Sequence, residues 1–234
     1  MKKILLTLLL IIMISCSSKN NIITLKDTFI DKEHETTLTF DGNLNLSNRQ
    51  ISKPLRDSII AAVLGSDFAK YSNNKVLRKY AKASLETFVE TTDSTLIGAT
   101  LYSKIDGEIV YADENYITFR RIMSTNIAPK NQGLMTICNY YVFDAKTGRH
   151  LQEKDLFSPQ TMNIIRKLLV KQAKEMATQN ELEIDLNKVR PNGNFAIMNS
   201  SIMYTFNPYE IAHPEIGFID IVLINKEKYI EIEP

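Results

Sequence analysis

The sequence contains few of the residues on which disulfide-rich domains, metal enzymes and nucleotide-binding proteins depend. Its 234 residues include 2 cysteines, 3 histidines, 8 glycines and no tryptophan. Two cysteines are too few for a disulfide framework. The sequence has no C-x-x-C or H-x-x-x-H spacing that would indicate zinc, and its glycines do not cluster into a phosphate-binding loop. We therefore expect no metal and no cofactor, and a chain stabilised by its hydrophobic core.

An excess of charge of either sign is also missing. The chain has 28 basic and 27 acidic residues, a net charge of +1. Loss of a leader containing Lys2 and Lys3 would leave 26 basic and 27 acidic residues, a net charge of −1. This balance does not indicate a basic face for nucleic acid. A hydrophobic content of 44% is typical of a globular chain with one domain or two small ones.

Signatures of catalysis are absent as well. No G-x-S-x-G motif of a serine hydrolase occurs. Four carboxylates lie near expected turns but lack the ordered spacing of a calcium loop, and we interpret them as solvating the end of a hairpin: Asp106, Glu108, Asp113 and Glu114. We therefore expect a protein that is not an enzyme. An uncharacterised envelope enzyme is kept as a third alternative, after the two binding functions given below.

The N-terminus has the pattern of a bacterial lipoprotein signal. Two lysines precede an apolar run over residues 4–14, which is too short to span a membrane as a permanent helix. The run ends in M-I-S-C, which resembles a lipobox with methionine in place of the usual leucine. We expect residues 1–15 to be a signal peptide and Cys16 to carry lipid. The alternative is an ordinary signal peptide followed by an unrelated cysteine.

Lipidation has consequences for the mature chain. Cys138 would be its only thiol, which excludes an intramolecular disulfide, and we interpret it as a small buried hydrophobe. Residues 16–35 are rich in polar side chains and are predicted to be a tether that reaches about 25 Å if flexible. Some surface-exported lipoproteins carry acidic residues just after the lipidated cysteine. No acidic run follows Cys16, so we expect the protein on the periplasmic side of the outer membrane.

The predicted fold class is α+β, with two small subdomains whose helices pack on antiparallel sheets. The first subdomain is assigned to residues 36–133. Two helices are expected in it, over 55–64 and from 74 or 75 to 91. The apolar stripe of the second helix is interpreted as core rather than as a ligand groove.

The remaining part of this subdomain is expected to be mostly β. The turn signal D-G-N at residues 41–43 is predicted to end a strand. The signal D-G at 106–107 is predicted to form the turn of a hairpin. A third strand is predicted over 115–123. The stretch Ser124–Gly133 is predicted to be an exposed loop that tunes the choice of partner without supporting the fold.

The second subdomain is assigned to residues 134–234. After a strand over 134–143, Ser158-Pro159 is predicted to cap a long helix that ends near Thr178. Two short strands, 195–198 and 202–206, read as a hairpin, and Gly217 precedes a buried return strand. The rest of the chain is expected to pack against this β unit.

The connection in this unit carries a family resemblance. The run F-N-P-Y-E-I-A, followed by four residues and a glycine, resembles the C-terminal domain shared by the anti-sigma factor RsiV, some peptidoglycan deacetylases and many Bacteroidetes lipoproteins. The upstream motifs F-D-x-x-T-G at 143–148 and D-L-F at 155–157 resemble the same domain. The matching residues of the main motif are Phe206, Asn207, Pro208, Tyr209, Glu210, Ile211, Ala212 and Gly217.

The resemblance implies both a fold and a non-catalytic function. It implies two paired subdomains, the second similar to a small subdomain of actin-like ATPases without their nucleotide site. The deacetylases carry catalysis in a separate metal-binding domain, for which this chain has no ligands. A G-G-A-H motif usual in the family is reduced here to Gly133. We therefore expect a lipid-anchored, non-catalytic module that binds cell-wall glycan or an envelope protein. The alternative is a lysozyme-binding or muramidase-inhibiting lipoprotein, since the anti-sigma relative senses lysozyme.

Two interpretations of Tyr209 and Glu210 remain open at this point. In the structural one, Tyr209 fills a gap beneath the hairpin and Glu210 accepts from nearby backbone N–H groups. In the functional one, an aromatic ring and a carboxylate at a rigid corner suit a sugar or a protein loop. A motif of proline, an aromatic residue and small residues is typical of a folding corner, which favours the structural interpretation.

Overall fold

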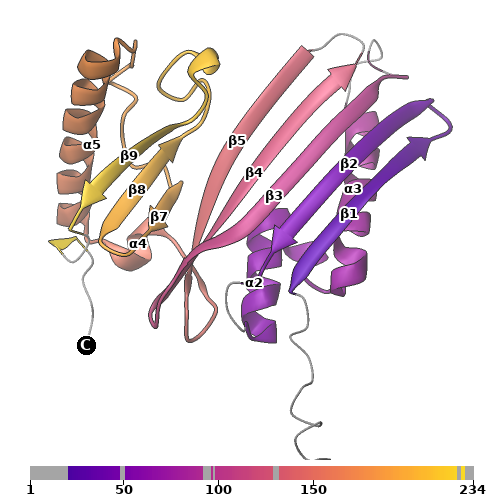
Figure 1. The fold of residues 1–234 in the computed structure, drawn as a ribbon, viewed down its shortest axis with the longest axis horizontal. Helices are drawn as coiled ribbons and strands as arrows, with labels where there is room; N and C mark the ends of the chain where they lie inside the picture. The colour runs from indigo at the N-terminus through magenta and orange to yellow at the C-terminus, as the bar shows by residue number, and fades with distance from the viewer. Residues whose placement is uncertain are drawn as a thin grey trace, which may run out of the picture.

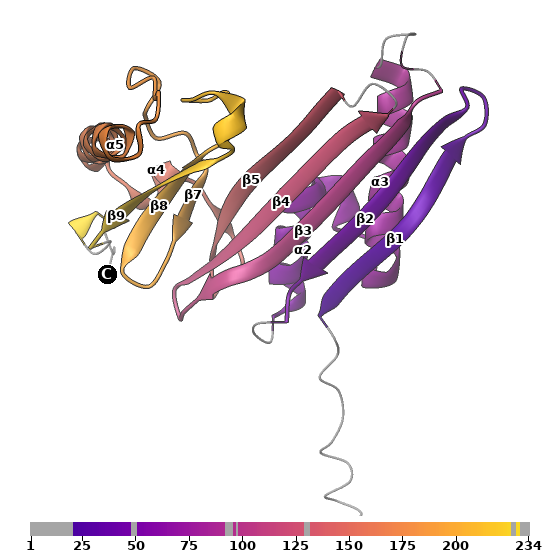
Figure 2. The same cartoon turned by 45° about the horizontal axis from the view of Figure 1, so that its top comes forward.

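The computed structural model describes residues 21–47, 51–91, 96, 98–128, 132–225 and 228–229. The expected signal peptide and Cys16 lie outside the described residues. The chain is a mixed α+β structure with one large and one small sheet, as Figures 1 and 2 show, so the predicted fold class is confirmed.

The large sheet has six strands in the order of the sequence. They are β1 (Ile22–Asp31), β2 (Thr36–Asn45), β3 (Thr100–Ala112), β4 (Tyr116–Ala128), β5 (Gln132–Asp144) and β6 (His150–Leu151). All neighbours pair antiparallel except β2 and β3, which are parallel. Parallel neighbours need a long crossover, and here it contains α2 (Lys53–Leu64), the short helix η1 (Ser66–Phe68) and α3 (Asn73–Thr91). Both α-helices lie on one face of the sheet (Figure 1).

Strand β1 corrects the prediction of a tether over residues 16–35. It pairs with β2 along its whole length. Its inward side chains Ile23 and Phe29 are 2% and 8% exposed, whereas the outward Ile30 is 63% exposed. This alternation with a period of two is the pattern of a half-buried strand. The charged residues between the apolar ones obscured it in the sequence.

The two predicted glycine turns are strand interiors. Gly42 lies within β2 and Gly107 within β3. A Cβ atom on Gly42 would lie 2.6 Å from the ring of Phe40, and one on Gly107 would lie 2.7 Å from the ring of Phe119. Each glycine therefore leaves room for an aromatic ring of the core.

The turn between β3 and β4 instead lies at residues 113–115. There the carboxylate of Asp113 accepts the backbone N–H groups of Asn115 at 2.8 Å and Tyr116 at 2.6 Å. Aspartate stabilises turns in this way. Of the carboxylates expected at a hairpin end, Asp106 pairs instead with Lys104 at 2.8 Å, on the body of the sheet.

The prediction of a long loop over Ser124–Gly133 is wrong. Strand β4 continues to Ala128 and β5 begins at Gln132. Ser124 lies opposite Thr136 in the ladder, and their hydroxyl groups are 2.9 Å apart. The β-branched residues of this stretch favour extended backbone, and their alternation with polar residues fits a strand.

Both predicted helices of the first unit are present. The hydroxyl of Ser52 accepts the N–H of Leu55 at the start of α2, and Gly65, with a φ of +113°, ends it. The buried side chains of α3 are Val76, Leu77, Ala81 and Leu85. They pack against β1 and β2 in the larger of the two main cores.

The C-terminal unit contains the predicted long helix and hairpin. Its elements are α4 (Glu153–Leu156), α5 (Pro159–Asn180), β7 (Phe195–Ile197), β8 (Ser201–Phe206), η3 (Pro214–Ile216) and β9 (Ile219–Ile224). Strands β7, β8 and β9 form an antiparallel sheet, covered by α5 on one face (Figure 2). Strands β5 and β6 belong to the large sheet, so the first unit extends beyond the boundary expected at residue 133.

Two asparagine side chains join the units at the outer edge of β5. Asn207 Oδ1 accepts the N–H of Cys138 at 2.7 Å, and Asn194 Oδ1 accepts the N–H of Tyr140 at 2.8 Å. Asn194 Nδ2 also donates to the carbonyl of Cys138 at 2.8 Å. Beyond the end of β6, the side chains of the two asparagines thus bond to the backbone edge of β5 in place of a neighbouring strand. Cys138 is fully buried in this junction, and burial raises the pKa of its thiol to about 11, so it has little thiolate character.

Candidate functional site

The candidate site is built from the connection between β8 and β9, at the end of the small sheet visible in Figure 1. The connection is held against the segment that follows α5. Ile184 and Ala212 form an isolated β-bridge, and the N–H of Asp185 donates to the carbonyl of Ile211 at 2.8 Å. Phe206 and Ile211, one on each side of the turn, are each 2% exposed and anchor it in the core.

Tyr209 lies at the tip of this anchored turn. The N–H of Glu210 donates to the carbonyl of Asn207 at 3.1 Å, which closes the turn. Tyr209 has a φ of +71° and a side chain that is 69% exposed. The expectation that it fills a gap beneath the hairpin is therefore wrong. A bulky residue in the left-handed region costs about 1–3 kcal/mol, and such strain is concentrated at functional sites.

Glu210 is held by a side chain rather than by the backbone. Its Oε2 accepts from Nδ2 of Asn192 at 3.0 Å, and the same amide donates to the carbonyl of Thr205 at 3.0 Å. This differs from the expectation that Glu210 accepts from backbone N–H groups. The contact holds the Glu210 carboxylate against the side chain of Asn192.

A pocket of about 490 Å³ lies beside the ring. Its lining combines the aromatic ring of Tyr209 with the aliphatic side chains of Ile184, Ile211 and Ala212. Four ionisable side chains complete it: Glu183, Asp185, Lys188 and His213. Lys188 Nζ lies 3.6 Å from Asp185 Oδ2. The pocket therefore offers hydrogen-bond donors and acceptors beside one aromatic ring, and half of its lining side chains are ionisable.

The other motif residues position the turn. Asn207 bonds to Cys138 in β5, and Pro208 follows it where strand pairing ends. Gly217 has a φ of +81°, a conformation that glycine adopts without strain, and it precedes β9. The motif therefore contains buried anchors, turn formers and one exposed aromatic residue.

Sequence reasoning missed the acidic and basic lining residues from the segment after α5. Glu183, Asp185 and Lys188 lie between the long helix and the hairpin, in a stretch for which no site was predicted. The alternation of Leu182, Ile184 and Leu186 was the available signal, because it indicates an extended segment able to pair with another.

The structure gives no support for a metal centre or a membrane span in the part of the chain that it describes. No group of three or more histidine, cysteine, aspartate or glutamate side chains is placed to hold a metal ion among those residues. Among the same residues, no helix has both the length and the apolar character needed to cross a bilayer.

Comparison with known proteins finds a family model that is similar to part of the C-terminal unit. Residues 154–223 match the family described as Protein of unknown function (DUF3298). A solved DUF3298 structure from Bacteroides fragilis is 17% identical, with a TM-score of 0.69 over 92% of this chain and 94% of that one. One from Pseudomonas aeruginosa is 12% identical, with a TM-score of 0.59 over 92% and 96%. At these identities the likeness shows a shared fold. No curated protein matches the sequence.

Proposed function

We propose that this chain is a non-catalytic binding module of the bacterial cell envelope that recognises cell-wall glycan. The glycan would bind at the turn that carries Tyr209 and at the pocket beside it, which we call the Tyr209 corner. One observation carries the proposal: a strained turn, anchored on both sides in the core, presents an exposed aromatic ring at a pocket with ionisable side chains. An aromatic ring that served only packing would be expected inside the core.

The chemistry of a sugar matches this arrangement. A pyranose ring has a face of C–H groups with partial positive charge, which stacks on the negative face of an aromatic ring. Its hydroxyl groups need donors and acceptors around that face. Glu183, Asp185 and Lys188 line the adjoining pocket and supply both kinds. A rigid turn also reduces the entropy lost when the ligand binds.

We expect the purified mature chain to be retained on insoluble peptidoglycan. Tyr209→Ala should weaken retention about tenfold or more, since truncation of a hot-spot aromatic residue commonly costs about 2 kcal/mol and about 1.4 kcal/mol is tenfold. Tyr209→Phe keeps the ring and should bind within about threefold of the wild type. Tyr209→Gly should lose binding but keep its stability, because glycine adopts a φ of +71° without strain. Co-sedimentation and thermal unfolding measure the two properties separately.

Tyr102→Ala is the matched control, because Tyr102 is 46% exposed on β3, away from the corner. Equal retention of Tyr209→Ala and wild type would contradict the assignment of the corner. Retention on immobilised lysozyme, without retention on peptidoglycan, would instead support the alternative of a muramidase-binding lipoprotein. Retention on neither would exclude both ligands.

The proposal includes a lipid anchor at Cys16 and a location on the periplasmic side of the outer membrane. The M-I-S-C sequence supports it, because the thiol of Cys16 is the group that would be acylated. Cys16→Ala should leave the protein unacylated and shift it from the membrane fraction to the soluble one. Labelled palmitate and fractionation measure these outcomes, and membrane-bound, labelled Cys16→Ala would contradict the anchor.

A further inference from the structure

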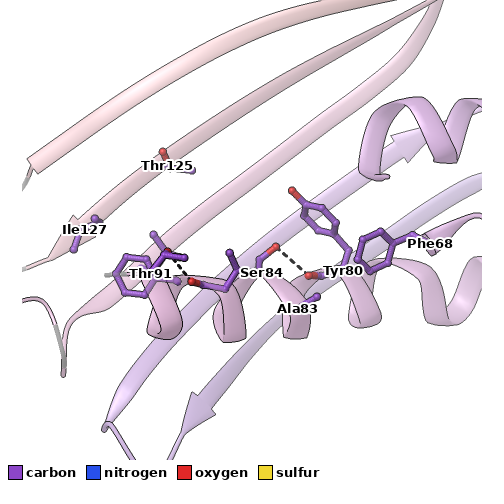
Figure 3. Close-up of a pocket in the computed structure, with 10 residues that line it drawn as sticks. Phe68, Tyr80, Ala83, Ser84, Thr91, Thr125 and Ile127 are labelled. Atoms are coloured by element: carbon purple, nitrogen blue, oxygen red, sulfur yellow. Dashed lines mark hydrogen bonds between the residues drawn. The ribbon is translucent and has the colours of Figure 1, made fainter. Parts of the chain in front are cut away.

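A second pocket, of about 520 Å³, lies between α3 and the large sheet, far along the chain from the Tyr209 corner. Figure 3 shows Tyr80 and Ser84 on α3 facing the strands, and Thr125 and Ile127 on β4 across from them. Phe68, Phe88 and Leu101 add apolar side chains to the lining, and Thr87 and Thr91 add hydroxyl groups. We call this space the α3 cleft.

The α3 cleft exists because the helices cover only part of the sheet. Strand β4 is buried at residues 117–119, but every residue from 120 to 128 is partly exposed. The apolar stripe of α3 divides accordingly. Part of it enters the core, whereas Tyr80, Ala83 and Phe88 line the cleft. The interpretation of the stripe as core is therefore incomplete, because Tyr80 and Phe88 pack against the larger core and also line the cleft.

The cleft is uncharged, and two of its five hydroxyl groups already donate within α3. Among the described residues that line it, none carries a charge. The hydroxyl of Ser84 donates to the carbonyl of Tyr80 at 3.0 Å, and that of Thr91 donates to the carbonyl of Thr87 at 2.7 Å. Strands β3 and β4 are paired on both sides, so their backbones offer no ladder to a guest. A bound peptide or sugar has many polar groups, and the remaining hydroxyl groups of Tyr80, Thr87 and Thr125 are too few to satisfy them all. The polar groups left without partners would be costly.

We propose that the α3 cleft binds a single unbranched alkyl chain of a monomeric amphiphile. Its volume falls within the range of about 300–1,000 Å³ found for ligand pockets. Its uncharged lining complements a hydrocarbon chain, which has no polar groups to satisfy. With no charged side chain to recognise it, the head group stays in solvent. Affinity should therefore depend on chain length, rising roughly threefold to fourfold for each methylene group until the cleft is filled, and should be insensitive to head-group charge.

The test is a calorimetric titration of the delipidated mature chain with decanoate, dodecanoate and dodecyl maltoside, each below its micelle concentration. Dodecanoate should bind more tightly than decanoate by about tenfold, since it has two more methylene groups. The two dodecyl compounds should agree within about threefold. Equal affinities for the two chain lengths, or a requirement for the carboxylate, would overturn the proposal.

Two variants fill the cleft from opposite walls. Ser84→Phe adds a ring from α3 and Thr125→Phe adds one from β4, and each should weaken dodecanoate binding at least tenfold. Lys82→Phe is the matched control, because it adds the same ring at an exposed position of α3 and should leave binding unchanged. If one filling variant fails to fold, the other decides. Unchanged binding in a folded filling variant, or binding only to phospholipid vesicles, would overturn the proposal. Tyr209→Ala should bind dodecanoate normally, which separates this site from the glycan proposal.

Discussion

Replacing Phe29 by alanine is expected to lower the free energy of unfolding by about 3 kcal/mol, in the range for truncation of a large buried aromatic residue. The side chain is 8% exposed on the inner face of β1, and the guanidinium of Arg78 lies 5.6 Å from its ring centre. The adjacent Ile30→Ala should change stability by less than about 0.5 kcal/mol, because Ile30 points outward and is 63% exposed.

The two variants therefore form a matched pair within one strand. Urea unfolding followed by circular dichroism measures the difference between them. A chain that begins at residue 36 should fail to fold stably, because it would expose the core beneath Ile23 and Phe29. Equal stability of the two alanine variants would instead show that residues 21–31 are undocked, as the tether prediction implied.

The elements that local sequence signals specify were predictable. Ser52 and Gly65 mark the two ends of α2 by capping chemistry, and Ser158 does so for the start of α5. The hairpin of β7 and β8 followed from two apolar runs around a polar turn. These signals act within a few residues, so they can be read without knowledge of the fold.

The large sheet was harder to predict because its irregularities depend on distant residues. An aspartate followed by glycine indicates a turn in isolation. At Gly107, however, the ring of Phe119 from the next strand occupies the space of a side chain, as does Leu44 from another. Only the assembled sheet distinguishes a glycine that forms a turn from one that admits a neighbouring ring.

Only the motif residues of the candidate site were predictable, whereas the lining residues from the segment after α5 and the arrangement of the site were not. The motif drew attention to Tyr209, yet the connection that carries its exposed ring is held in place by the bridge between Ile184 and Ala212. That bridge joins segments far apart in the chain, and nothing in the composition of the motif specifies it. The α3 cleft was missed for the same reason, since the helical period alone does not tell how much of a helix the sheet covers.

The junction between the two units gives the second large prediction. Asn194→Ala should lower the free energy of unfolding by about 2–5 kcal/mol, since each buried polar group left without a partner costs about 1–3 kcal/mol. The variant orphans the N–H of Tyr140 and the carbonyl of Cys138 at the edge of β5. The carbonyl of Thr205 keeps its second donor, the side-chain amide of Asn192.

Asn194→Asp separates the two bonds to β5. Its carboxylate can still accept from Tyr140 but cannot donate to the carbonyl of Cys138. The variant should therefore be less stable than the wild type, because a buried negative charge replaces the lost donor. Asn187→Ala, at an exposed position in the link after α5, is the matched control and should change stability by less than about 0.5 kcal/mol. The thiol of Cys138 gives a second readout: it is buried in the same junction, so Asn194→Ala should speed its reaction with a thiol reagent under native conditions. Normal stability with an unreactive thiol would show that Asn194 does not hold the two units together.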